Sequence, residues 1–294
     1  MSSGRIGVTG AAGFVGGHLL HHLQYTGLEI VCILRPNRDP APFRLRGVET
    51  RFADLARPAA CRGAFDEIDV LVHLSGMGQV AGLVPMLEEV GLRRGVFVGS
   101  TGVHTRLASP SAEAKRRGED ALARSSLAWT IVRPTMIYGG PGDRNMARLL
   151  GLIRRIGIVP VPGGGATMQQ PVHVDDLVST IVAALAARES IGRAYDVGGP
   201  EALTLRTLID QAARSLGRRA RILPLPIAAS AHAVELVRRT GAPFPIRVEQ
   251  ILRLAESKAV AIGDAIRDLG HRPRPFHEGI QQEAVALGLI SRRL

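Results

Sequence analysis

Cysteine is scarce in this sequence. Only two of the 294 residues are cysteines, Cys32 and Cys61, and they lie in unrelated segments without the spacing of metal ligands. Two isolated thiols argue against a fold held by disulfides and are typical of proteins in a reducing compartment. We therefore expect a cytoplasmic protein in which both thiols are buried as small apolar side chains.

An apolar run long enough to span a bilayer is also missing. The best candidate, residues 222–237, is interrupted by two prolines and contains His232 and Glu235. The first residues lack the basic segment, apolar stretch and small-residue cleavage site of an export signal. We predict neither a membrane span nor an export signal.

Lysine is nearly absent although the net charge is +11. Lys115 and Lys258 are the only lysines among 37 basic residues, so the other 35 are arginines. These arginines are scattered singly or in pairs, without the interleaved aromatic residues that stack on bases. We predict no nucleic-acid partner, and instead a basic surface that attracts small anionic ligands.

Short β-branched runs alternate with helical patterns through the first half of the chain. Several of the runs are apolar throughout, as expected for strands that helices cover on both faces. This alternation predicts an α/β fold with a doubly wound parallel sheet of the Rossmann type. The predicted strands are 5–9, 29–34, 49–53, 70–74, 96–99 and 130–133, and the predicted helices are about 13–26, 57–64, 79–91 and 110–125.

The pattern changes after Pro134, where Gly- and Pro-rich stretches separate the helices. We predict helices near 143–156, 174–188 and 204–216, a returning strand at 194–197, and helices with short connections such as 241–245 after about residue 199. The expected domains are a cofactor domain of residues 1–136, completed by about 174–197, and a smaller, mostly helical substrate-side lobe of residues 137–173 and 198–294. Oligomeric state is open, and a homo-oligomer is possible.

A glycine-rich turn, TGAAGFVG at residues 9–16, follows the first strand and opens the first helix. Gly10 permits a tight turn, Gly13 lets the backbone approach a pyrophosphate, and Gly16 lets the helix pack closely on the strand. The N–H groups and the dipole at the helix start favour a diphosphate. The turn predicts a dinucleotide site with contacts from Thr9, Gly10, Ala12, Gly13, Phe14, Val15 and Gly16.

The end of the second strand indicates which dinucleotide binds. An NAD site would place Asp or Glu there to accept a hydrogen bond from the ribose 2′-hydroxyl. This chain has the sequence LRPNR at residues 34–38, in which Arg35 and Arg38 can meet a 2′-phosphate. We predict NADP(H) as cofactor, with NAD(H) as the alternative.

Together with further motifs in the same order, the turn resembles the short-chain dehydrogenase/reductase superfamily. The further motifs are DL at 54–55, HLSG at 73–76, GST at 99–101, RPTMIYG at 133–139 and PVHVDD at 171–176. The segments YDVGGP at 195–200 and LGHRP at 269–273 are similar to its atypical or extended, epimerase/dehydratase-like branch. Within that branch the chain is most similar to proteins akin to the nucleotide-binding accessory subunit of respiratory complex I, several of which bind NADPH without a demonstrated reaction.

The resemblance implies further cofactor contacts. Asp54 and Leu55 would hold the adenine, and Pro134 and Ile137 would lie by the nicotinamide. The path of the adenosine and diphosphate would be lined by Leu74, Ser75 and Gly76.

The resemblance also implies a reaction centre of a Ser or Thr, a Tyr and a Lys. Ser100 or Thr101 fits the first role, and Lys115 fits the lysine, which also holds the ribose hydroxyls. Ser111, one helical turn before Lys115, stands where the superfamily has its tyrosine. A serine hydroxyl is far less acidic than a phenol, so Ser111 cannot simply inherit the acid/base role, and its place after Ser109 and Pro110 suits a helix start.

Other groups could supply the proton. His104 lies just beyond the fifth strand, and its imidazole titrates in the useful range. Tyr138 fits better as a packing residue in the RPxxxYG turn. His173 begins a helix whose start Asp175 and Asp176 would cap.

The sequence disfavours a metal site on the first helix and a nucleotide-sugar substrate, because the residues that each would need are missing. His18, His21 and His22 share the first helix, and we expect no carboxylate or thiol beside them, hence no metal site. Related nucleotide-sugar enzymes carry a phosphate-binding arginine where this chain has Gln169 and Gln170.

Three functions remain open. The first is an NADP-dependent oxidoreductase that transfers a hydride between NADPH and a small carbonyl or enone substrate. The second is a non-catalytic NADPH-binding sensor or assembly protein, which the missing tyrosine favours. The third is an epimerase or dehydratase, which the missing tyrosine and arginine disfavour.

Overall fold

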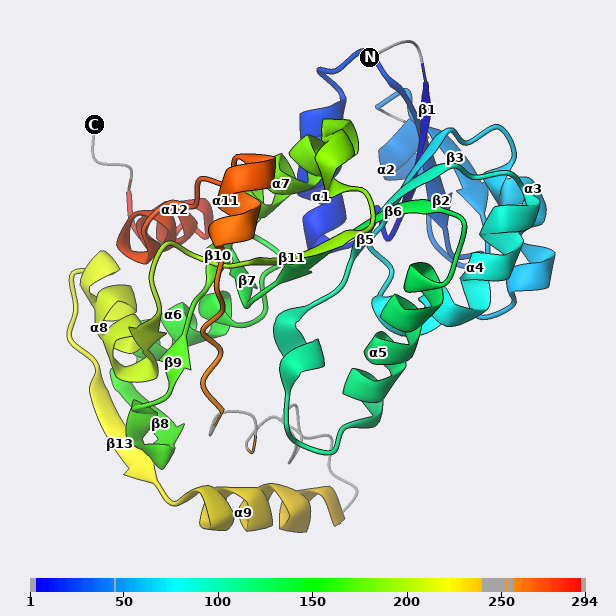
Figure 1. Ribbon diagram of the computed structural model, residues 1–294. Coiled ribbons are helices and arrows are strands. Elements are labelled where there is room, and N and C mark those ends of the chain that lie inside the picture. Colours follow the sequence, from blue (N-terminus) through cyan, green and yellow to red (C-terminus); the bar gives the residue numbers. More distant parts are fainter. Residues whose placement is uncertain (1–3, 45, 240–251, 253–255, 292–294) are drawn as a thin grey trace. The chain divides into compact units, whose positions relative to one another are not determined.

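The computed structural model describes residues 4–44, 46–239, 252 and 256–291 (Figure 1). The chain divides into two compact units, each built from three segments that alternate along the sequence. The sheet unit comprises Met1–Thr135, Val174–Val197 and Ala261–Arg272, and the lobe unit comprises Met136–His173, Gly198–Val260 and Pro273–Leu294. Residues 261–272 group with the sheet unit, whereas the sequence analysis assigned them to the lobe.

A seven-stranded parallel sheet forms the centre of the sheet unit. Its strand order is β11-β6-β5-β4-β1-β2-β3, so the chain winds outward from β1 first to one side and then to the other. This confirms the predicted α/β, doubly wound fold. The strands are β1 (Arg5–Thr9), β2 (Glu29–Leu34), β3 (Glu49–Phe52), β4 (Val70–His73), β5 (Arg94–Val98), β6 (Ala128–Pro134) and β11 (Arg193–Val197).

Helices cover both faces of this sheet (Figure 1). One layer contains α1 (Phe14–Leu23), α7 (Val174–Ala186) and α11 (Gly263–Leu269), and the other contains α3 (Arg62–Phe65), α4 (Val80–Glu89) and α5 (Pro110–Ala123). The short α2 (Ala41–Arg44) precedes β3. Because the sheet is buried on both sides, its central strands carry apolar residues such as Val8, Leu71 and Val96, each of which is 0% exposed.

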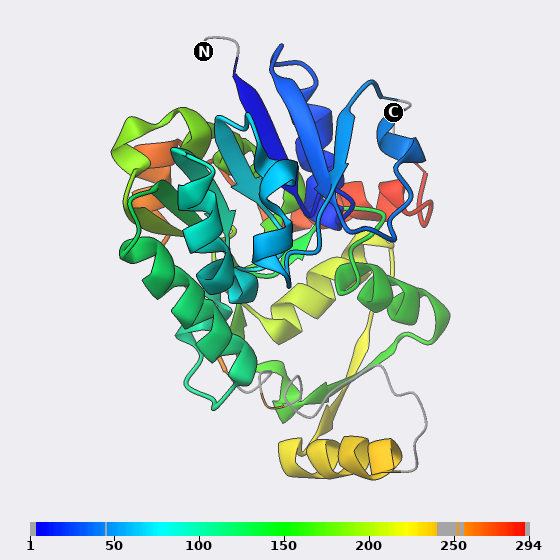
Figure 2. The same cartoon turned by 90° about the vertical axis from the view of Figure 1, so that its right-hand side faces the viewer.

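The lobe unit is built from helices and three small strand pairs (Figure 2). Its helices are α6 (Met146–Arg155), α8 (Leu205–Ser215), α9 (Ile227–Arg239) and α12 (Phe276–Ala286). The strand pairs are β7 (Ile137–Tyr138) with β10 (Val172–His173), β8 (Ile158–Pro162) with β13 (Arg221–Leu225), and β9 (Met168–Gln169) with β12 (Leu203–Thr204). The sequence analysis did not predict these pairs, and the connection that it expected at 241–245 lies outside the described residues.

The interior of the lobe unit contains a pair of carboxyl groups. Asp143 accepts hydrogen bonds from the backbone N–H groups of Asn145 and Met146, at 2.8 and 2.7 Å, at the start of α6. Glu283 on α12 is 0% exposed and accepts a hydrogen bond from Gly139 N at 3.0 Å. Burial, and then the neighbouring Asp143, raise the pKa of Glu283 to about 8. Glu283 is therefore largely a neutral acid at neutral pH.

Among the residues that the structure describes, no helix is both long enough and apolar enough to cross a bilayer.

Candidate cofactor and active site

The glycine turn has the backbone geometry of a phosphate cradle. Gly10 adopts a φ of +71°, and a Cβ there would come within 2.8 Å of the carbonyl carbon of Leu74. A Cβ on Gly16 would lie 2.5 Å from the carbonyl oxygens of both Gly10 and Ala11. Helix α1 begins after Gly13 without a side-chain cap and without an acidic residue in its first turn. The first N–H groups of α1 are thus left for an anionic ligand.

A cavity of about 590 Å³ opens beside this turn. Its lining includes Ala12 and Gly13 from the turn and two guanidinium side chains, Arg38 and Arg46. Arg38 donates a hydrogen bond from Nη2 to the carbonyl oxygen of Ala12 at 3.3 Å. The exposed Arg35, which the sequence analysis paired with Arg38, does not line this cavity. The sequence analysis missed Arg46 because it is one of many scattered arginines and lies beyond the short helix α2.

The buried His73 at the end of β4 forms hydrogen bonds that connect the end of β1 to the loop after β4. The Thr9 hydroxyl and Nδ1 of His73 lie 2.9 Å apart, and Nε2 of His73 lies 3.2 Å from the carbonyl oxygen of Gly76. A carbonyl only accepts, so Nε2 carries the proton and Nδ1 accepts from Thr9. Burial lowers the pKa of His73 to about 4, which keeps the ring neutral. This arrangement fixes the predicted segment Leu74–Gly76 against β1.

The predicted adenine contacts follow β3 directly. Leu55 is buried, whereas the carboxylate of Asp54 is half-exposed and accepts a hydrogen bond from the N–H of Ala56 at 3.2 Å. Both residues stand at the carboxyl edge of the parallel sheet, where nucleotides bind in open α/β folds.

Ser100 and Lys115 meet beyond the end of β5. Nζ of Lys115 on α5 lies 3.3 Å from Oγ of Ser100, which also accepts a hydrogen bond from the N–H of Gly102 at 3.0 Å. The Thr101 hydroxyl is turned to a different partner and donates to the carbonyl oxygen of Pro134 at 3.4 Å. Of the two hydroxyls left open by the sequence, Ser100 is therefore the one beside the lysine.

Ser111 lies in the first turn of α5 and is exposed. Ser109 is the helix cap, since its side chain accepts a hydrogen bond from the N–H of Ala112. One helical turn separates Ser111 from Lys115, as the sequence indicates. An exposed hydroxyl of ordinary acidity at this place does not supply the acid that the missing tyrosine would provide.

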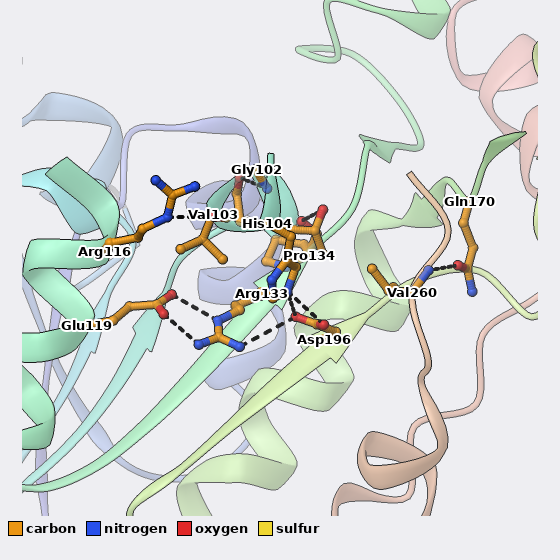
Figure 3. Close-up of polar contacts among 12 residues, drawn as sticks. Gly102, Val103, His104, Arg116, Glu119, Arg133, Pro134, Gln170, Asp196 and Val260 are labelled. Carbon is orange, nitrogen blue, oxygen red and sulfur yellow. Dashed lines mark hydrogen bonds and ion pairs between the residues drawn. The ribbon is translucent and has the colours of Figure 1, made fainter. Parts of the chain in front are cut away.

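His104 ends the 3₁₀ turn Thr101–His104 and contacts the carboxylate of Asp196 on β11 (Figure 3). Nε2 of the ring lies 3.0 and 2.9 Å from the two carboxylate oxygens of Asp196. Asp196 in turn faces Arg133 of β6, and Arg133 is bound by Glu119 of α5 (Figure 3). The sequence analysis found His104 but not Asp196, because the two residues are 92 positions apart.

Three residues considered in the sequence analysis, for catalysis, substrate binding or cofactor binding, lie in the lobe unit. Tyr138 is fully buried, and its ring packs on those of His173 and Phe276 at centroid distances of 5.3 and 5.1 Å. Gln170 donates a hydrogen bond to the carbonyl oxygen of Gly199 at 2.8 Å. It also accepts one from the N–H of Val260 at 2.8 Å (Figure 3). Ile137 opens β7, beside Tyr138.

One expectation about the first helix is wrong. His18 does have a carboxylate partner, since its Nδ1 lies 2.7 Å from Oδ1 of Asp175 at the start of α7. The sequence could not show this contact because α1 and α7 pack together from distant parts of the chain. Within the described residues no three His, Cys, Asp or Glu side chains gather as a metal site would require.

Comparisons with known proteins bear on this site. Residues 10–151 match a protein family described as NAD(P)H-binding. The chain is 28% identical over 288 residues to the mitochondrial NADH dehydrogenase (ubiquinone) 1 alpha subcomplex subunit 9 of Arabidopsis thaliana, covering 89% of this chain and 70% of that protein. It is 25% identical over 294 residues to the NAD(P)H azoreductase of Xenophilus azovorans, covering 96% and 98%.

The same fold occurs in a solved enzyme structure. The UDP-glucose 4-epimerase of Thermotoga maritima, determined with UDP-glucose, superposes with a TM-score of 0.75 over 97% of this chain and 98% of that one, at 16% identity. At that identity the likeness shows the fold alone.

The strand order and the turn define a Rossmann-type fold, and the family match identifies its first half as NAD(P)H-binding. Residues 10–151 form the NAD(P)H-binding domain, and the chain as a whole is similar to a named reductase and to a subunit of respiratory complex I. The resemblance inferred from the motifs is thereby confirmed.

Proposed function

We propose that this protein is an NADP-dependent oxidoreductase that reduces a small carbonyl or enone compound. The observation that carries the proposal is the contact between Ser100 and Lys115, 3.3 Å apart at the carboxyl edge of the sheet that holds the dinucleotide turn. A site that only stored a nucleotide would have no need of a polarising hydroxyl beside the chain's rare lysine.

The residues of the turn fit NADPH. The close approaches at Gly10 and Gly16 exclude a Cβ from the turn, and Arg38 and Arg46 bring two positive charges to the cavity beside it. A guanidinium pair suits a 2′-phosphate, which supports NADPH over NADH. Arg35 remains part of the proposed 2′-phosphate site as an exposed residue that could close over it.

Each polar group has a distinct role in the proposed reaction. NADPH supplies the hydride, and the chain must orient the substrate and deliver a proton. The Ser100 hydroxyl donates a hydrogen bond to the substrate oxygen, while Lys115 holds Ser100 and the ribose hydroxyls. His104 provides the proton that the missing tyrosine cannot. We place substrate selection in the lobe unit.

A non-catalytic NADPH sensor or assembly protein is the second candidate. It is favoured by Ser111, exposed where a catalytic tyrosine would stand, and by the similarity to a complex I subunit. An epimerase with a nucleotide-sugar substrate has less support, since Gln170 is engaged in hydrogen bonds within the lobe unit. Cys32 and Cys61 are buried free thiols, which is compatible with the reducing cytoplasm that we propose as the location.

Two measurements test the proposal. Titration with NADPH and NADH, followed by cofactor fluorescence, should give the lower Kd for NADPH. NADPH oxidation is then followed with an aromatic quinone, an unsaturated aldehyde and an azo dye, for the wild type and for Lys115→Ala. We expect turnover that falls about 10- to 1,000-fold in the variant. Tight NADPH binding without oxidation by any probe would instead establish the sensor.

A further inference from the structure

The His104–Asp196 pair is joined from two distant parts of the sheet unit. His104 follows β5, and Asp196 lies on β11 in register with Arg133 of the intervening strand β6. The imidazole presents one nitrogen, Nε2, to both carboxylate oxygens at 2.9 and 3.0 Å. The His104 side chain is 47% exposed, whereas that of Asp196 is 21% exposed. The carboxylate thus faces inward and the ring faces outward.

Asp196 is held from its other side by charged groups. Nη1 of Arg133 lies 3.8 Å from Oδ1 of Asp196, and Arg133 is itself bound by Glu119 through two hydrogen bonds of 2.9 and 2.5 Å (Figure 3). A guanidinium is charged at all relevant pH values and attracts a carboxylate at this distance. The chain Glu119–Arg133–Asp196 therefore fixes the position of the carboxylate that meets His104.

The backbone that carries His104 is fixed as well. Arg116 of α5 donates to the carbonyl oxygens of Val103 and Thr105, at 3.1 and 2.8 Å, on either side of His104. The ring can therefore change its orientation only by breaking its bond to Asp196. Of the charged groups nearby, Arg133 lies beside Asp196, and Arg116 binds the backbone on either side of His104.

We propose that Asp196 is a positioning residue that fixes the proton on Nε2 of His104, so that Nδ1 is the nitrogen that exchanges protons with the substrate. This rests on the proposed reductase function. A carboxylate only accepts, so the nitrogen that faces it carries a hydrogen in both charge states of the ring. Nδ1 is left as the site that gains and loses a proton. The His104–Asp196 pair takes the place of the absent tyrosine.

The proton and electron balance of a carbonyl reduction is then complete. The substrate carbon accepts the hydride supplied by NADPH, and the substrate oxygen accepts the proton from Nδ1 of the imidazolium. The Nδ1–H bond breaks, an O–H bond forms, and the neutral ring keeps its Nε2 proton toward Asp196. Water then returns a proton to Nδ1. NADPH is oxidised by two electrons and the carbonyl is reduced by two.

Nitrogen-15 NMR of the full chain labelled at histidine tests the positioning directly, with His104→Gln identifying the signal. In the wild type we expect neutral His104 as the Nε2–H tautomer alone, and in Asp196→Leu a mixture of tautomers. Asp268→Asn is the matched control, because Asp268 forms ion pairs with Arg193 of the same strand β11 without contacting His104. A mixture in the wild type would overturn the inference.

Kinetics provide the second readout, with the quinone, aldehyde and azo-dye probes. Asp196→Leu should lower kcat about 10- to 100-fold while the Kd for NADPH stays within about threefold, and Asp196→Glu should recover part of the loss. A wild type that turns over a probe, with kcat and pH profile unchanged in Asp196→Leu, would refute the inference and leave the reductase standing. If the tautomer is fixed but none of the probes is reduced by NADPH, the reductase function is refuted and the positioning of His104 by Asp196 still holds.

Discussion

At the scale of single residues, neighbouring side chains of the same chemical type have different contacts in the site. Ser100 and Thr101 are adjacent hydroxyls, yet only Ser100 lies beside Lys115, because the Thr101 hydroxyl donates to Pro134. Likewise Arg38 and Arg46 reach the cavity beside the turn while Arg35 does not. Which of two similar side chains acts is decided by local backbone direction.

The serine prediction follows from this difference. Ser100→Ala removes the hydroxyl that would polarise the substrate, so kcat should fall about 10- to 100-fold. Thr101→Val removes only a long hydrogen bond to a backbone carbonyl and should change kcat by less than about threefold. Steady-state NADPH oxidation measures both. A larger loss of kcat in Thr101→Val than in Ser100→Ala would show that Thr101, and not Ser100, polarises the substrate.

The arginine prediction concerns cofactor choice. In Arg38→Ala/Arg46→Ala the 2′-phosphate loses two charge-assisted partners, so the Kd for NADPH should rise about 10- to 100-fold while that for NADH changes little. Arg44→Ala, an exposed neighbour that does not line the cavity, is the control. Fluorescence titration gives all the constants, and an equal loss for both nucleotides would remove the case for NADPH. Arg35→Ala tests the prediction made from the sequence.

At the scale of elements, each strand and helix is predictable to the extent that its own residues determine it. The seven strands of the main sheet are predicted within about two residues, and the central ones have continuous apolar runs that need no knowledge of a partner. The lobe strands are short, and two of them contain prolines, so they form only because a distant segment pairs with them. Asp196 was missed for the same reason, because its partner His104 lies 92 positions away in the sequence.

The contact between α1 and the turn yields a stability prediction. Gly16→Ala would place a Cβ 2.5 Å from two carbonyl oxygens, so the helix must move away, at a cost of about 1–3 kcal/mol. Gly17→Ala in the same helix meets no atom within 4 Å and should be neutral or stabilising by up to about 1 kcal/mol. Denaturant unfolding without nucleotide measures both. Equal stability of the two variants would contradict the close approach.

Helix α12 gives the pH prediction. Glu283 has a folded pKa of about 8, above its ordinary value of 4.5, so the folded protein binds the proton more tightly than the unfolded chain. Its stabilising contribution is complete below about pH 4.5 and is lost as the pH rises toward and past 8, by on the order of 2–4 kcal/mol.

The matching variant is Glu283→Gln, which resembles the protonated acid. It should flatten the decline in unfolding free energy between pH 5 and 9, whereas Glu278→Gln, exposed on the same helix, should leave the decline intact. Urea unfolding at several pH values supplies the comparison. A wild type whose stability is constant over this range would show that Glu283 is ionised in the fold.

At the scale of the whole molecule, the sequence predicts the class of fold and the dinucleotide turn, because both are encoded in consecutive residues. The division into units is harder to predict, since it depends on which distant segments pack together. The sequence of α11 does not indicate to which unit the helix belongs, but Tyr195 and Arg193 of β11 bind Asp268 of α11 and draw that helix to the sheet unit.

That late segment has a consequence for how the protein is made. Since the sheet unit includes Ala261–Arg272, a nascent chain that has exposed all seven strands still lacks one of the helices that flank them. Completion of the nucleotide-binding half must therefore wait until residues 261–272 have also been made. A gene fragment that stops after β11 would yield a sheet whose outermost strand has lost its helical partner, so neither unit is available as a single continuous stretch of peptide.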